Sequence, residues 1–147
     1  MSNVKIVFDN KVTDGNMMAR CVNYAEHYLM VMDKILDEGD EFYKEYFMDI
    51  RPSTKKVIKI IKHRFTEEGK KDENNVMIAF NPIDLYLFFF SVKTHLDTQF
   101  DIYKDKGHFI TTFYNYDEAL TDREYSADQM KKLKNMIEEI SEKANKG

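Results

Sequence analysis

The chain has 147 residues, of which 43% are hydrophobic and 33% charged, and its net charge is −4. This length suits one domain, and the hydrophobic share excludes a disordered chain. No apolar run reaches the ~18 residues of a membrane span, and the single cysteine, Cys21, excludes a disulfide framework and a cysteine-based zinc site.

The first half of the chain has the pattern of one strand followed by helices. Residues 4–8 alternate between apolar and polar, which predicts a short strand. Apolar residues recur every three or four positions over residues 17–36, which predicts an amphipathic helix capped by Gly39. A second helix over residues 42–50 is expected to end at Pro52, because the residue before a proline avoids helical geometry. Residues 54–65 fit a helix or a β-branched strand, and we slightly favour the helix.

The second half of the chain has the pattern of short strands. Breaks near residues 81, 95 and 105 have the spacing of an antiparallel meander. Residues 85–92 are apolar on all sides, which suits a central strand buried on both faces. The sequence Lys-Asp-Lys-Gly at 104–107 predicts a hairpin turn with Gly107 in the left-handed conformation. We therefore predict an antiparallel meander of about four strands over residues 74–116.

The C-terminal segment predicts one long helix. Ser126 and Gln129 form a capping-box pattern, in which two side chains bind the free amides of a first helical turn. An apolar stripe follows along residues 130–140, and we expect it to pack on the sheet. The predicted fold class is therefore α+β, with an N-terminal helical half, a meander and a C-terminal helix in a single domain over residues 1–147.

Charge is divided sharply between two neighbouring segments. Residues 24–50 carry eight acidic and two basic side chains, whereas residues 51–71 carry eight basic and two acidic ones. The structural interpretation is that both faces are solvated or lie against each other. The functional interpretation is an acidic surface that attracts a basic protein partner. We predict such a partner-binding site at Asp37, Asp40, Glu41, Tyr43 and Glu45.

The basic segment over residues 51–71 supports an alternative function, nucleic-acid binding. Its candidate contacts are Lys55, Lys56, Lys59, Lys62 and Arg64. The net charge of the chain is negative, however, and lysine lacks the forked grip of arginine on phosphate. Nucleic acid is therefore the less favoured partner.

Aromatic residues are concentrated in the predicted meander, which holds 11 of the 20 in the chain over residues 80–116. The phenylalanines suit a core, because each buries a large apolar area. The tyrosines are candidates for the sheet face that the C-terminal helix leaves open. There they would line a pocket between sheet and helix, formed by Tyr86, Tyr103, Tyr114 and Tyr116. Such a pocket supports a second alternative function, a small-molecule-binding or minor enzymatic domain.

Catalytic and metal motifs are missing from the sequence. The four histidines have no metal-ligand spacing, and His95 two residues before Asp97 is a weak candidate for an oriented base. No glycine-rich phosphate loop, nucleophile motif or CxxC pair occurs. We therefore predict no catalytic residue, no metal and no cofactor, and a chain that leans away from being an enzyme.

The predicted function is that of a small, soluble, acidic protein-binding protein in the cytoplasm. An inhibitor, an immunity-type protein or an adaptor would each fit this description, and none of them needs a catalytic site. The expected partner is another protein with a basic surface, not a membrane, and a homo-oligomer is compatible with the same features.

Overall fold

The computed structural model describes residues 3–9, 17–64, 75–109 and 115–146 of the chain. In chain order, its elements are β1 (Val4–Asp9), α1 (Met17–Asp37), α2 (Glu41–His63), β2 (Asn75–Phe80), α3 (Pro82–Lys106) and α4 (Tyr116–Lys146). The described residues form four helices and one two-stranded sheet. The predicted α+β fold with a four-strand meander is therefore wrong, because most of residues 74–116 is helical.

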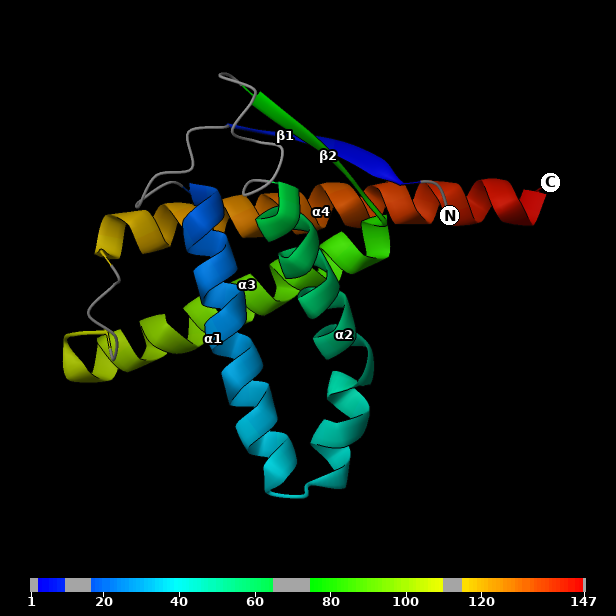
Figure 1. The fold of residues 1–147 in the computed structure, drawn as a ribbon. Coiled ribbons are helices and arrows are strands. Elements are labelled where there is room, and N and C mark those ends of the chain that lie inside the picture. Colours follow the sequence, from blue (N-terminus) through cyan, green and yellow to red (C-terminus); the bar gives the residue numbers. More distant parts are fainter. Residues whose placement is uncertain (1–2, 10–16, 65–74, 110–114, 147) are drawn as a thin grey trace.

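The helices are arranged around α3. α1 and α2 form an antiparallel hairpin, and the end of this hairpin that holds its turn projects past α3 (Figure 1). α3 packs against α1, α2 and α4, so it occupies the centre of the molecule. α4 packs mainly along α3, not on a sheet as the sequence predicted. The β1–β2 ribbon lies at the end of the molecule away from the hairpin turn (Figure 1).

The strand predicted at residues 4–8 is confirmed, and the second strand falls at the start of the predicted meander. β1 covers the predicted strand at residues 4–8, and β2 covers the short apolar stretch before Asn81. They pair antiparallel, with Val4 opposite Phe80 and Ile6 opposite Ile78. Ile78 and Phe80 are buried, so β2 also contributes side chains to the core.

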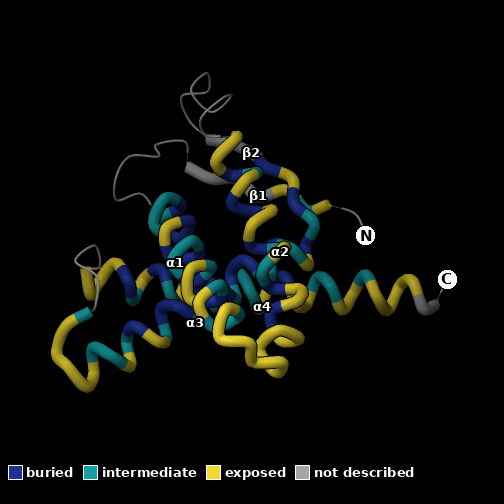
Figure 2. The backbone as a smooth tube through the Cα atoms, turned by 60° about the horizontal axis from the view of Figure 1, so that its bottom comes forward, coloured by how far each residue is buried: buried dark blue, intermediate teal, exposed yellow. Residues whose placement is uncertain are grey.

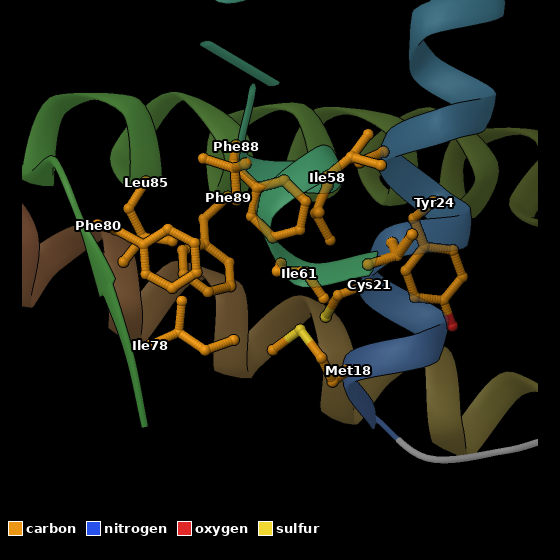
Figure 3. Close-up of a cluster of buried hydrophobic side chains, with 14 of the residues drawn as sticks. Met18, Cys21, Tyr24, Ile58, Ile61, Ile78, Phe80, Leu85, Phe88 and Phe89 are labelled. Atoms are coloured by element: carbon orange, nitrogen blue, oxygen red, sulfur yellow. The ribbon is translucent and has the colours of Figure 1, made fainter. Parts of the chain in front are cut away.

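The main core lies where the four helices and β2 meet (Figure 3). Each helix contributes its apolar stripe, and α3 contributes the adjacent rings of Phe88 and Phe89, whose centroids are 5.2 Å apart. The fully buried side chains of this core include Cys21, Ala25, Val57, Leu85, Phe88, Phe89, Val92 and Leu96. A second, smaller cluster fills the inside of the α1–α2 hairpin and consists of Tyr28, Met32, Phe47 and Ile50.

α3 replaces the predicted central strand and hairpin for identifiable local reasons. Asn81 caps the helix, because its Oδ1 accepts hydrogen bonds from the amides of Ile83 at 2.9 Å and Asp84 at 3.4 Å. Pro82 follows at the first helical position, where a proline costs nothing. Gly107 does adopt the left-handed conformation, with φ of 76°, but as the C-cap of α3 and not in a hairpin turn. A helix with neighbours on three sides can be apolar all round, which explains residues 85–92.

α2 continues through Pro52, where the sequence predicted an end. Proline lacks the amide that would bond to the carbonyl of residue 48, and this normally weakens a helix interior. Here the helix is held on both sides of the proline. Ile50 and Thr54 are buried, and the Ser53 hydroxyl donates to Asp84 of α3 at 2.8 Å. The preference for helix over residues 54–65 is confirmed as far as His63.

α4 begins at Tyr116, ten residues before the predicted start at Ser126. Asn115 is the cap, since its Oδ1 accepts hydrogen bonds from the amides of Asp117 at 3.0 Å and Glu118 at 3.2 Å. Ser126 is buried inside the helix, where its hydroxyl donates to the Asp122 carbonyl at 2.8 Å. Ser126 is therefore not a helix cap. Its hydroxyl bonds back to the preceding turn, as serine side chains often do within helices.

Candidate functional site

The turn end of the α1–α2 hairpin exposes apolar side chains. We call residues 30–49, which include the turn, the hairpin tip. The described residues include eight exposed large hydrophobic side chains, and six of them belong to the tip: Met30, Val31, Phe42, Tyr43, Tyr46 and Met48. Phe42 is 68% exposed, and this end of the backbone is largely exposed in Figure 2. Exposed apolar side chains gathered at one end of a molecule are typical of a binding site.

The aromatic side chains of the tip form two stacked pairs along the first turns of α2. Phe42 stacks on Tyr46 with ring centroids 6.1 Å apart, and Tyr43 stacks on Phe47 at 5.6 Å. Each pair has i,i+4 spacing, which brings side chains together on a helix surface. Phe47 is buried against Tyr28 of α1. The buried ring of Phe47 therefore holds the exposed rings in place, and one face of the exposed rings stays open to solvent.

The tip is also acidic. Between residues 34 and 49 the chain carries six carboxylates and two lysines, and all eight side chains are exposed. The turn that connects the helices is held by backbone hydrogen bonds from Glu38 to Ile35 and from Gly39 to Leu36. Gly39 has a φ of 79°, which suits the residue that ends α1. The tip thus combines negative charge with apolar rings on a turn of defined shape.

All five residues predicted for partner binding lie in the tip and are exposed: Asp37, Asp40, Glu41, Tyr43 and Glu45. One of them also has a structural role. Asp40 is the N-cap of α2, and its Oδ1 accepts a hydrogen bond from the amide of Phe42 at 2.9 Å. A substitution of Asp40 would therefore weaken α2 as well as change the surface charge.

Phe42, Tyr46 and Met48 were not predicted as site residues, because the prediction for this segment rested on its charge. A signal was present. Apolar side chains at positions 42, 43, 46, 47 and 50 cover a wider arc than one helix can bury against a single neighbour. Phe47 and Ile50 take the buried part of that arc, so the remainder is left exposed.

The basic residues proposed for nucleic-acid binding lie on the second half of α2, and several are paired with acids. Lys56 binds Asp84 at 3.0 Å and Lys62 binds Glu26 at 3.0 Å. An open groove of about 470 Å³ between α1 and α2 is lined by Glu26, Leu29, Lys55, Ile58, Lys59, Lys62 and His63. The charge of this face is thus partly balanced by carboxylates of neighbouring helices.

The predicted tyrosine pocket cannot have a sheet as one wall, because α3 takes the place of the predicted strands. Its described tyrosines do not all lie at one place. Tyr86 and Tyr103 both lie on α3, about 25 Å apart along the helix axis. Tyr103 and Tyr116 do meet, with ring centroids 5.1 Å apart, in a cluster with Phe100 and Phe109. Tyr114 lies outside the described residues. Among the described residues, these packed rings lie where the end of α3 meets the start of α4.

His95 and Cys21 both lie at buried positions on their helices. His95 is buried and stacks on His27 of α1 with ring centroids 5.7 Å apart, and burial lowers its pKa to about 4. The carboxylate of Asp97 binds Lys93 at 2.7 Å. Burial raises the pKa of the Cys21 thiol far above its usual range, so this thiol stays protonated. These positions give no support to a catalytic base or nucleophile.

A buried polar network joins α1 to α4. Asp122 is fully buried, and its two oxygens accept hydrogen bonds from Arg20 at 2.7 and 3.0 Å. The Tyr24 hydroxyl donates to the same carboxylate at 2.7 Å, and burial followed by this hydrogen bond raises the pKa of Tyr24. Asp122 is about 100 residues away in sequence from both Arg20 and Tyr24, so no local sequence pattern predicts these contacts. Each group has a partner, which makes the network a structural link between helices.

No match is found when the chain is compared with protein-family models, with curated proteins and with solved structures. Among the residues that the structure describes, no group of three or more His, Cys, Asp or Glu side chains is placed to hold a metal ion. Within the same residues, none of the helices combines the length and the apolar character needed to cross a membrane. Function is therefore inferred from the geometry of the chain itself.

Proposed function

We propose that this protein acts by binding another protein through the hairpin tip. The observation that carries the proposal is the exposure of Phe42, at 68%, beside the ring of Tyr46 and a rim of carboxylates. Aromatic side chains surrounded by polar groups are the residues that most often dominate the energy of a protein interface. An inhibitor, immunity-type or adaptor role agrees with such a surface.

The charge of the tip defines the chemistry of the partner. Six exposed carboxylates against two lysines favour a partner surface rich in lysine or arginine. Complementary charge increases the rate of encounter, and arginine can also stack on exposed aromatic faces. The expected partner therefore presents a basic patch with at least one apolar contact for Phe42.

The test compares tagged wild-type protein with the double variant Phe42→Ala/Asp37→Lys in capture from a lysate of the source cell. Proteins retained are identified by mass spectrometry, and the dissociation constant is then measured with the purified partner. We expect this constant to rise at least about tenfold in the variant, as for loss of a central interface contact.

Neither substitution should unfold the chain. Phe42 is exposed, and Asp37 ends α1, where a cation is more favourable than a carboxylate. The matched control is Ile83→Ala/Asp128→Lys, which removes one exposed apolar and one exposed acidic side chain away from the tip. If the tip variant binds the purified partner as tightly as this control does, the tip is not the binding surface.

A further inference from the structure

One exposed stripe of α2 carries opposite charges at its two ends. The residues are Glu41, Glu45, Met48, Pro52, Lys55, Lys59 and Lys62, and all seven are exposed. They are spaced by alternating steps of four and three, which keeps them on one side of a helix. The acidic end, the apolar middle and the basic end follow one another over about 31 Å.

This order makes the stripe complementary to itself in the antiparallel direction. When a second α2 is laid along the first with a two-fold axis beside residue 50, Glu41 faces Lys59 of the second copy and Glu45 faces Lys55 of the second copy. Met48, which is 65% exposed, then faces Pro52 of the second copy. The two-fold axis repeats each contact, so four opposite-charge contacts surround an apolar centre.

We propose that a second copy of this chain pairs with the first through this stripe, as an antiparallel α2–α2 dimer. The charge pattern distinguishes this arrangement from a parallel one, in which carboxylates would face carboxylates and lysines would face lysines. Lys62 lies outside the four contacts and keeps its ion pair with Glu26 of its own chain.

The inference rests on the proposed function, because it names a second copy as one protein that the hairpin binds. The two surfaces overlap at Glu41, Glu45 and Met48. Phe42 and Asp37 serve the proposed function alone, whereas Lys55 and Lys59 serve only the pair. A basic foreign partner that covers Glu41 and Glu45 therefore competes with the second copy.

The experiment measures self-association of the purified full chain by analytical ultracentrifugation over a concentration series. Two charge-reversal variants are used, Glu41→Lys/Glu45→Lys and Lys55→Glu/Lys59→Glu. In each variant alone all four contacts join like charges, so we expect the dimer dissociation constant to rise at least about tenfold. In an equal mixture of the two variants every contact again joins opposite charges, and a heterodimer should form with an affinity near that of wild type.

Salt and matched controls complete the test. Raising the salt from about 0.1 M to about 1 M shortens the screening length from about 10 Å to about 3 Å, so the wild-type dimer should weaken. The controls reverse the same number of exposed charges on α4: Glu138→Lys/Glu142→Lys and Lys131→Glu/Lys132→Glu. Both should dimerise as wild type does.

Three results would overturn the inference. The first is a wild-type chain that stays monomeric up to about 1 mM at low salt, where any remaining affinity is too weak to be specific. The second is a dimer that neither charge reversal affects, and the third is a mixture of the two variants that stays monomeric. If self-association fails while Phe42→Ala/Asp37→Lys still loses a foreign partner, the proposed function stands without the dimer.

Discussion

The buried carboxylate of Asp122 gives the sharpest test of how the helices are held together. In Asp122→Ala the guanidinium of Arg20, whose side chain is only 17% exposed, loses both of its hydrogen bonds to the carboxylate, and the Tyr24 hydroxyl loses its acceptor. Removing one partner of a buried ion pair costs about 3–5 kcal/mol, because the other charge is left uncompensated. For a chain of this length, a loss of about 3 kcal/mol lowers the melting temperature by about 10 °C.

Urea unfolding followed by circular dichroism measures this cost. The matched control is Asp128→Ala, which removes an exposed carboxylate from the same helix and should change the free energy of unfolding by less than about 0.5 kcal/mol. The double variant Arg20→Met/Asp122→Leu removes both charges and should be clearly more stable than Asp122→Ala. A cost below about 1 kcal/mol for Asp122→Ala, or a double variant as unstable as the sum of its parts, would refute the reasoning.

Two further predictions concern pH and helix capping. The pKa of buried His95 is about 4 instead of 6.5, so the unfolded chain binds a proton below pH 6.5 that the folded chain refuses, and stability present above pH 6.5 is lost as the pH falls toward 4. The difference of 2.5 between the two pKa values corresponds to about 3 kcal/mol of unfolding free energy. Urea unfolding at several pH values should show this loss in wild type and in the exposed control His108→Gln. A His95→Gln variant with the same loss would contradict the prediction. Gly107→Ala should cost about 1–2 kcal/mol in urea unfolding, because φ is 76° and an added Cβ meets no atom within 4 Å, so the cost comes from the backbone alone. Gly39→Ala, at φ of 79°, should cost about the same, and a clear difference between the two glycines would show that packing contributes.

The part of the fold that sequence predicted well is the part controlled by local pattern. α1 has a clean apolar stripe, and a glycine follows it, so its range agrees with the prediction to within a residue or two. β1 and β2 also follow their apolar patterns. In each case the periodicity of the segment and its flanking residues pointed to the same structure.

The misassigned part of the fold is the centre of the molecule, where local pattern is least informative. A helix that is covered on several sides loses its polar face, and its sequence then resembles a buried strand. α3 is such a helix, and the run Phe88 to Phe90 strengthened the wrong choice through its preference for strands. The local feature that distinguishes helix from strand here is the dipeptide Asn81-Pro82, which can begin a helix as readily as it can end a strand.

The charge of the candidate site could be predicted from the sequence, whereas its shape could not. Exposed carboxylates could be expected from composition, because charged side chains are seldom buried. Exposure of Phe42 and Met48 depends on where α3 crosses the hairpin, and that is a tertiary property. The meeting of Tyr103 and Tyr116 in a packed cluster is a tertiary property of the same kind.

The charge division at residue 51 has a different meaning once α2 is one helix. If Pro52 had ended a helix, the acidic and basic segments would have been separate elements, free to pack on each other within one chain. Because α2 runs from Glu41 to His63, its exposed stripe cannot fold back on itself, and its ends lie about 30 Å apart. The acidic end of the stripe can therefore contact the basic end of such a stripe only on a second molecule. The continuity of α2, with opposite charges at its two ends, is therefore the feature on which the proposed pairing of two molecules rests.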